Sequence, residues 1–222
     1  MRTLWVVDPS VNSPETEGVQ QILENWDGRS RLFQPALNRG EGPAPGDGYD
    51  VAGIVLMGSG VSVHDSLGWQ DRLSEWARPI VEGRIRRPLL GICYGHQLIA
   101  HLAGGVVADL SDTGDKRVAI EESQIVSDGL LDEGESLRVV VSHREHVVRE
   151  PEGWKITARR EGVPVDGLED PARPTYSYQF HPEARHEFTR RAGLPDEAVD
   201  ERLRVDGRRL LEAFRQRVRA EP

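Results

Sequence analysis

The chain contains 222 residues, of which 28 are basic and 37 acidic, so its formal net charge is −9. This acidic balance argues against a nucleic-acid-binding protein, because such proteins gain affinity by neutralising phosphates. With 37% apolar and 29% charged residues, the sequence is typical of a folded globular protein, and we expect residues 1–222 to form a single domain.

Strands and helices alternate in the first half of the predicted structure. Val19, Ile22 and Trp26 recur at helical spacing, and the apolar runs before and after them are continuous, as in the central strands of parallel sheets. This pattern predicts a parallel α/β arrangement. In chain order we expect a strand at 3–7, a helix at 15–26, a loop at 38–48, a strand at 51–57, a helix at 69–81, a strand at 88–92 and a helix at 95–103.

From about Val106 the pattern changes to short alternating runs. We expect antiparallel or mixed strands here, forming a small antiparallel extension of the sheet, at 117–121, 137–142, 154–159 and 175–180. The last predicted element is a helix at about 196–219, with apolar side chains on one face and Arg and Glu around them. We expect this helix to dock on the domain, and Gly207 is a candidate break within it.

The N-terminal segment and the cysteine count indicate the cellular compartment. The first apolar run covers only Leu4 to Val7, whereas a signal peptide needs about 7–15 apolar residues and a membrane span about 20. We therefore expect a soluble cytoplasmic protein without membrane contact. The single cysteine, Cys93, excludes an internal disulfide and a thiolate-rich zinc site.

The most specific motif is Gly91-Ile92-Cys93-Tyr94-Gly95, in which a buried strand leads directly into a helix. This is the pattern of a nucleophile elbow with sulfur in place of oxygen. The glycines are needed because a Cβ at either position would collide with neighbouring backbone in so sharp a turn. The thiol would stand at a helix N-terminus, which favours the thiolate. An isolated cysteine is usually a small buried apolar residue, but glycines on both sides at such a junction favour a nucleophile.

A base for this thiol is predicted at His181-Pro182-Glu183. Residues two apart in an extended chain face the same side, and Pro182 biases His181 toward extended geometry. The carboxylate could therefore hold one imidazole nitrogen while the other faces the sulfur. A lone histidine near a strand end is more often an ordinary core or surface residue, so His181 gains weight only as a partner of Cys93.

A glycine-rich loop, Gly58-Ser59-Gly60, leaves the predicted strand at 51–57. Such a loop can direct backbone N–H groups at a developing oxyanion, with the N–H of Tyr94 as a second donor. An ordinary tight turn is the alternative. Nucleotide binding is rejected because no Gly-Lys-Ser/Thr sequence follows the glycines.

Together these motifs resemble the class I, triad-type glutamine amidotransferase family, and within it the glutaminase domain of GMP synthetases. The resemblance is carried by Gly91 to Gln97, by Phe180 to Glu183 and by the loop at 58–63, and it extends over about residues 3–190. It implies a doubly wound, flavodoxin-like α/β fold with a mostly parallel sheet flanked by helices. It also implies a glutaminase that releases ammonia through a cysteine γ-glutamyl thioester, without a cofactor.

The resemblance assigns a role to each matching residue. Cys93 would be the nucleophile, His181 the general base and then acid, and Glu183 the group that orients His181. The oxyanion hole would be formed by backbone N–H groups at Gly58, Ser59, Gly60 and Tyr94. The substrate's amino-acid head would be held by Gln97, Ser142, His143 and Glu145.

Two positions depart from the family's pattern. The family's oxyanion loop reads Gly-Gly-Pro-x-Ser, whereas residues 58–62 read Gly-Ser-Gly-Val-Ser. This difference leaves open whether the chain hydrolyses its substrate without a partner chain. Glu145 stands where the family has an aspartate, and its extra methylene would alter recognition of the substrate's α-amino group. Three hypotheses follow: a glutaminase, a γ-glutamyl amide or peptide hydrolase without a partner, and a catalytically inactive domain that binds a ligand or partner.

Partner and metal predictions follow from missing motifs. The sequence contains no Ser-Gly-Gly-x-Asp-Ser pyrophosphate-binding loop, so an ammonia-accepting synthase would be a separate chain. Histidines stand close together at 143 and 146 and at 181 and 186. A catalytic zinc site would need three well-spaced ligands, and no helical histidine pair at i, i+4 occurs, so we expect no metal site.

Overall fold

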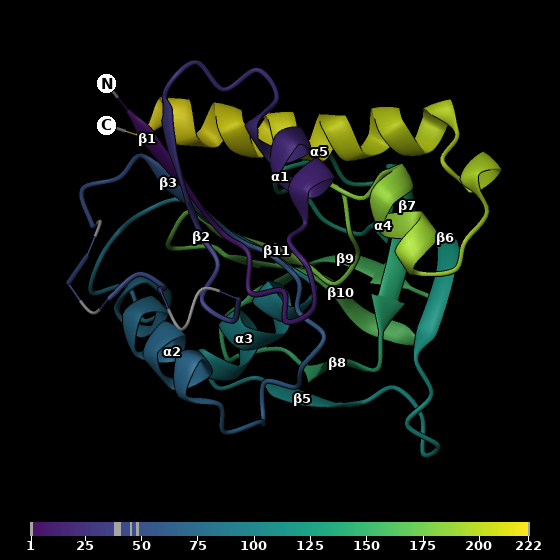
Figure 1. The fold of residues 1–222 in the computed structure, drawn as a ribbon, viewed down its shortest axis with the longest axis horizontal. Coiled ribbons are helices and arrows are strands. Elements are labelled where there is room, and N and C mark those ends of the chain that lie inside the picture. Colours follow the sequence, from purple (N-terminus) through teal and green to yellow (C-terminus); the bar gives the residue numbers. More distant parts are fainter. Residues whose placement is uncertain (1, 38–40, 45, 48, 222) are drawn as a thin grey trace.

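The computed structural model describes residues 2–37, 41–44, 46–47 and 49–221. The predicted loop at 38–48 therefore lies partly outside the described residues. Within them, the chain forms one extended sheet with helices on both faces (Figure 1). This is the α/β architecture that the alternating strands and helices predict.

Five parallel strands form one half of the sheet, in the order β2-β1-β3-β4-β11. The chain passes from β1 to β2 on one side and then returns to β3 on the other side of β1. Such a reversal is a topological switch point, where α/β proteins bind ligands at the carboxyl ends of the strands. These strands are β1 (Thr3–Val7), β2 (Arg29–Phe33), β3 (Gly53–Leu56), β4 (Leu89–Ile92) and β11 (Thr175–Tyr178).

Six antiparallel strands continue the sheet beyond β11, which confirms the predicted antiparallel extension. The main path runs β11-β10-β9-β6-β7, and β8 joins β10 through the pair Val165 and Val147 while also pairing with β5. The strands are β5 (Val106–Asp109), β6 (Arg117–Ile125), β7 (Ser136–His143), β8 (Glu145–Arg149), β9 (Lys155–Arg160) and β10 (Val163–Asp170).

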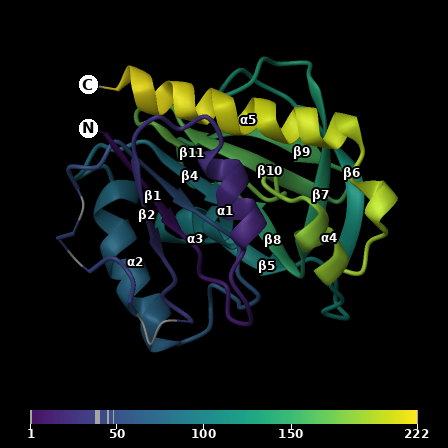
Figure 2. The ribbon, with the colours of Figure 1, turned by 45° about the horizontal axis from the view of Figure 1, so that its top comes forward.

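Two helical layers cover the parallel half of the sheet (Figures 1 and 2). Alternate residues of β1 show the division: Leu4 and Val6 pack with α1 and α5, whereas Trp5 and Val7 pack with α2 and α3. The helices are α1 (Thr16–Leu23), α2 (Gly68–Val81), α3 (Tyr94–Leu102), α4 (His186–Arg191) and α5 (Glu201–Ala220), with a 3₁₀ turn at Asp196–Ala198. No described helix is both long and apolar enough to cross a membrane.

Several elements carry too weak a pattern to be predicted. Four of the five residues of β2 are exposed, and β10 contains Pro164 and Gly167, which interrupt a strand pattern. The register of β10 against β9 shifts at Gly167, where a Cβ would lie 2.8 Å from the Cβ of Ala158. These strands depend on neighbours that are distant in sequence. The short helix α4 and strands β5 and β8 were also not predicted.

The predicted break at Gly207 is wrong, because α5 is continuous from Glu201 to Ala220. Asp200 caps this helix by accepting a 2.9 Å hydrogen bond from the backbone N–H of Leu203. Gly207 is buried instead, at a close contact with the backbone of Pro182. The glycine therefore lets α5 approach the segment that follows β11.

Replacing Gly207 with alanine is expected to lower the free energy of unfolding by about 1–3 kcal/mol. The new Cβ would lie 2.2 Å from the carbonyl oxygen of Pro182, so either α5 or the 181–185 segment has to move. This cost opposes the helix-propensity gain of about 1 kcal/mol. Urea unfolding monitored by circular dichroism measures the change. Arg208→Ala, on the exposed face of α5, is the control, and equal midpoints for both variants would contradict the prediction.

Candidate active site

Three of the predicted motifs meet at the carboxyl ends of neighbouring parallel strands. Gly58 follows β3, Cys93 follows β4, and His181 follows β11. In the sheet, β4 lies between β3 and β11. Residues far apart in the sequence are therefore brought to one edge of the sheet, beside the topological switch point.

Cys93 occupies a strained turn between β4 and α3. Its backbone has φ 53° and ψ −104°, which is the left-handed side of backbone space that residues with a Cβ rarely adopt. A Cβ at Gly95 would lie 2.1 Å from the carbonyl oxygen of Leu56, and one at Gly91 would lie 2.7 Å from the carbonyl carbon of Gly95. The two glycines are thus required by close backbone approaches. The turn holds the sulfur at the first turn of α3, which begins at Tyr94.

His181 and Glu183 form a buried pair next to this sulfur. The Nδ1 atom of His181 lies 2.8 Å from Oε1 of Glu183, and both side chains are at most 5% exposed. The His181 backbone N–H donates to the carbonyl of Val140. The centroid of the Phe188 ring lies 4.3 Å from the centroid of the imidazole ring. Within the described structure, Nε2 of His181 has no hydrogen-bond partner. One nitrogen is therefore held and the other is free for chemistry.

The charge of His181 depends on its two neighbours. Burial alone would lower its pKa, but the carboxylate of Glu183 and the sulfur of Cys93 outweigh burial and raise the pKa of His181 to about 10. The imidazolium form is thus favoured at neutral pH. Such a group can give a proton to a leaving amine.

The loop after β3 approaches both Cys93 and His181. A Cβ at Gly58 would lie 2.9 Å from Cε1 of His181 and 3.5 Å from Cβ of Cys93, so only a glycine fits between them. The hydroxyl of Ser59 donates a 2.7 Å hydrogen bond to the carbonyl of Pro9. This bond anchors the loop at the position where the family's pattern has a second glycine.

Further hydrogen bonds fix the end of the same loop. The hydroxyl of Ser62 donates to Oε1 of Glu145 at 2.7 Å, and the side-chain amide of Gln70 donates to the carbonyl of Ser62 at 2.7 Å. The N–H of Tyr94 stands at the first helical position of α3, where a helix leaves its N–H groups unpaired. The fixed loop and the unpaired N–H of Tyr94 could together donate hydrogen bonds to a developing oxyanion.

A cavity of about 200 Å³ opens at this site. It contains Cys93, His181 and Glu183, the predicted loop residues Gly58, Ser59 and Gly60, and also Ser142. The backbone carbonyl of Ser142 lies 4.0 Å from the sulfur. The remaining lining residues are Ser10, Val11, Asn12, Ser13, Glu15, Lys116, Phe188, Arg191 and Ala192.

Gln97, His143 and Glu145, which were predicted to hold the substrate, are not among the residues that line this cavity. The Nδ1 atom of His143 donates to the carbonyl of Glu145 at 3.0 Å, and its Nε2 atom accepts from Arg160 at 3.0 Å. Burial, followed by the charge of Arg160, lowers the pKa of His143 to about 3. The amide of Gln97 donates to the Glu145 carbonyl at 2.7 Å. The polar side-chain groups of these residues are therefore hydrogen-bonded to other protein groups, and they do not face the cavity.

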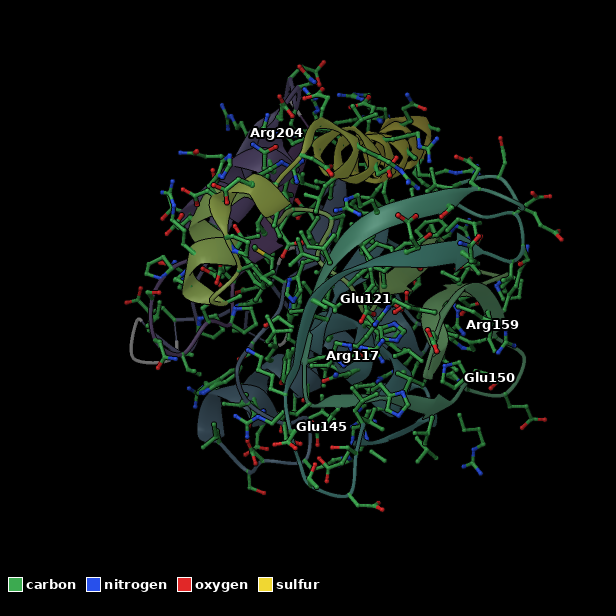
Figure 3. All side chains as sticks on the ribbon, turned by 90° about the vertical axis from the view of Figure 1, so that its right-hand side faces the viewer. Arg117, Glu121, Glu145, Glu150, Arg159 and Arg204 are labelled. Atoms are coloured by element: carbon green, nitrogen blue, oxygen red, sulfur yellow. The ribbon has the colours of Figure 1, made fainter. Side chains whose placement is uncertain are left out.

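Arg160 belongs to a buried ion cluster in the antiparallel half of the sheet. Its guanidinium contacts Asp166, which is fully buried, and pairs with Glu121. The hydroxyl of Ser123 donates to Asp166 at 2.6 Å. In Figure 3, which faces this half, Glu121 lies on β6 and Glu145 lies lower, near the start of β8. Among the described residues no group of three or more His, Cys, Asp or Glu side chains could hold a metal ion.

Charged side chains that the sequence did not single out also line the cavity. Arg191 of α4 donates to Ser13 at 2.7 Å and pairs with Glu15. Burial, opposed by Arg191, raises the pKa of Glu15 to about 7. Lys116 also lines the cavity and makes no hydrogen bond or ion pair to the part of the chain that the structure describes. The Glu15–Arg191 pair joins positions 176 apart, so no local pattern could predict it.

A model of the family described as glutamine amidotransferase class-I matches residues 48–200. The GMP synthase (glutamine-hydrolyzing) of Aromatoleum aromaticum is 33% identical over 148 residues, which cover 62% of this chain and 26% of that protein. The corresponding protein of Porphyromonas gingivalis is 37% identical over 145 residues, covering 64% and 27%. The chain thus matches only about a quarter of the length of these relatives.

Solved structures support the fold. A glutamine amidotransferase from Thermotoga maritima superposes with a TM-score of 0.80 over 99% of both chains, at 17% identity. One from Methylobacillus flagellatus gives a TM-score of 0.77 over 98% of this chain and 94% of that one, at 18% identity. These similarities confirm the doubly wound sheet with flanking helices. Because the family model covers more than half of the sequence, the chain belongs to the class I glutamine amidotransferase family.

Proposed function

We propose that the protein hydrolyses the side-chain amide of glutamine and releases ammonia through a γ-glutamyl thioester on Cys93. The observation that carries this proposal is the strained Cys93 turn beside the His181–Glu183 pair, whose Nδ1–Oε1 distance is 2.8 Å, at a cavity. A nucleophile, a base and a group that orients the base are the minimum set for covalent amide hydrolysis.

In the proposed reaction, the sulfur of Cys93 attacks the side-chain carbonyl carbon and forms a C–S bond. Negative charge moves to the carbonyl oxygen, where the N–H groups of Tyr94 and of the loop at 58–60 would stabilise it. His181 then protonates the leaving nitrogen, the C–N bond breaks and ammonia departs. Neutral His181 next takes a proton from water, which attacks the thioester, so that glutamate leaves and the sulfur regains its electron pair.

The curated relatives are named as GMP synthases that hydrolyse glutamine. These names support glutamine as the substrate of this chain. They also support a separate ammonia-accepting synthase chain as its partner. We propose this partnership for a cytoplasmic enzyme that needs no cofactor.

A second candidate substrate class is γ-glutamyl amides or peptides, which need no partner. The observation in its favour is that two cationic side chains line the cavity: Arg191, which pairs with Glu15, and Lys116, which has no ion pair among the described residues. His181 would protonate the leaving nitrogen, and a leaving amino acid would then occupy the same cavity as these two cations. Its carboxylate would meet one of these cations.

Ammonia or amine release from glutamine and from a panel of γ-glutamyl dipeptides tests these candidates. Wild-type protein is expected to release ammonia from glutamine, and Cys93→Ala to release none, because the nucleophile is lost. Release of amino acids from γ-glutamyl dipeptides without ammonia from glutamine would select the second candidate, and Lys116→Ala should then raise KM for the dipeptides alone. Equal product formation by wild type and Cys93→Ala would refute both.

A further inference from the structure

Two buried glutamine side chains connect the sulfur of Cys93 to the backbone of Glu145. The Nε2 atom of Gln179 lies 3.7 Å from the sulfur. The Nε2 atom of Gln97 lies 3.2 Å from Oε1 of Gln179 and 2.7 Å from the carbonyl oxygen of Glu145. Gln179 is fully buried and Gln97 is 4% exposed. Neither amide has a role in the reaction proposed above.

The direction of both amides follows from the acceptor at the far end of this series. A backbone carbonyl can only accept, so the NH₂ group of Gln97 must face Glu145. The same NH₂ group then meets the carbonyl oxygen of Gln179. With its oxygen held there, Gln179 turns its own NH₂ group toward the sulfur of Cys93. The arrangement thus presents a donor, not an acceptor, to the sulfur.

His143 and Arg160 hold the other side of the Glu145 carbonyl. Arg160 has only donors, so Nε2 of His143 accepts its N–H at 3.0 Å. The proton of His143 is then on Nδ1, which donates to the Glu145 carbonyl at 3.0 Å. Because Arg160 is itself bound to the buried Asp166, the end of the series is rigid.

We propose that Gln179 is a further catalytic residue, whose side-chain N–H donates to the sulfur of Cys93 and stabilises its anionic form. Gln97 is then a positioning residue that fixes the orientation of the Gln179 amide. This inference rests on the proposed function, because it takes Cys93 as the nucleophile. It also explains why Gln97 matches the family's motif without lining the cavity.

The donor acts at two points of the reaction. Before attack, it favours the electron-rich sulfur that forms the C–S bond. During thioester hydrolysis, the C–S bond breaks and the electron pair returns to sulfur, so the same N–H supports the leaving group. A hydrogen bond to a charged acceptor is stronger than one between neutral groups, and the effect is therefore specific to the anionic sulfur.

Alkylation of Cys93 by iodoacetamide, measured from pH 5 to pH 10, tests this role without any substrate. The sulfur displaces iodide and reports how readily the anionic form is reached. Gln179→Met keeps the side-chain length but removes the donor, and we expect a 10- to 100-fold slower reaction at pH 6.5 (about the contribution of a hydrogen bond to a charged group). The two rates should converge at high pH, where the anion forms without help. Gln97→Met should give a smaller shift in the same direction.

The control is Gln124→Met, which removes the side-chain amide of a glutamine on β6 that donates to Ser136 and does not line the cavity, and it should leave the alkylation profile unchanged. If Gln179→Met does not fold, Gln179→Glu replaces the donor with an oxygen of the same geometry, and its profile should move further toward high pH. An unchanged profile, or a rate lowered equally at every pH, would overturn the role of Gln179. Neither result bears on whether wild-type protein hydrolyses glutamine, so the two proposals fail separately.

Discussion

Replacing Glu183 with glutamine is expected to lower kcat for glutamine hydrolysis by about 10³- to 10⁴-fold, a loss known for neutral replacement of the orienting carboxylate in a catalytic triad. In the wild type, Oε1 of Glu183 lies 2.8 Å from Nδ1 of His181. A carboxylate can only accept there, and it fixes the proton on Nδ1. An amide can instead turn its NH₂ group to Nδ1, which favours the wrong tautomer.

The pH profile gives this prediction a second readout. Glu183 raises the pKa of His181, so its neutral replacement should lower that pKa from about 10. The imidazolium of His181, which protonates the leaving nitrogen, is then lost at a lower pH than in the wild type. The basic limb of kcat/KM should therefore move toward neutral pH in Glu183→Gln, measured by ammonia release from pH 5 to pH 11.

Glu169→Gln is a matched control, because Glu169 is a partly buried glutamate on β10 that does not line the cavity. It should keep the wild-type rate and profile. Circular dichroism should show both variants folded. Wild-type kinetics in Glu183→Gln, with an unmoved basic limb, would remove Glu183 from the mechanism.

The parts of the site that the sequence could predict are local in sequence. The Cys93 turn depends on glycines two residues to each side, because a Cβ at Gly91 would overlap Ile99 and the backbone of Gly95. His181 and Glu183 are two residues apart, and Pro182 keeps the chain extended between them. The spacing of the residues in such motifs is therefore visible in the sequence, although the contact of Gly95 with Leu56 depends on how β3 packs against α3.

Contacts between distant segments could not be predicted in this way. Glu15 and Arg191 meet only because α1 and α4 pack side by side, with Glu17 and Glu187 each accepting from the other's backbone N–H. The orientation of Gln97 likewise depends on where β8 places the Glu145 carbonyl. Since β8 itself was not predicted, the sequence could suggest that Gln97 belongs to the site but not what it contacts.

The fold shows the same division between local and long-range information. Central strands such as β3 and β4 are buried on both faces, and their continuous apolar runs predict them correctly. Strands β2 and β10 lack such runs, so their place in the sheet depends on pairing with strands that are distant in sequence. The order of the strands in the sheet therefore could not be predicted from the local pattern of apolar residues.

Replacing Gly95 with alanine is expected to lower the rate of glutamine hydrolysis by about 10²-fold and to destabilise the fold. A Cβ at residue 95 would lie 2.1 Å from the carbonyl oxygen of Leu56 and 2.9 Å from its carbonyl carbon. Leu56 ends β3, immediately before the loop that contains Gly58. Relief of the overlap must move either α3 or β3, and each movement separates the loop from Cys93.

The loss of catalysis should exceed the loss of stability. Overpacking of this kind costs about 1–3 kcal/mol of folding free energy, which leaves much of the protein folded, whereas a misplacement of about 1 Å can cost 10²-fold in rate. Thermal unfolding and ammonia release measure the two effects. Gly68→Ala is the control, because its Cβ would meet only a side-chain nitrogen of Arg72 at 3.7 Å. A folded Gly95→Ala protein with wild-type turnover would show that contact between β3 and α3 does not set the geometry of the nucleophile.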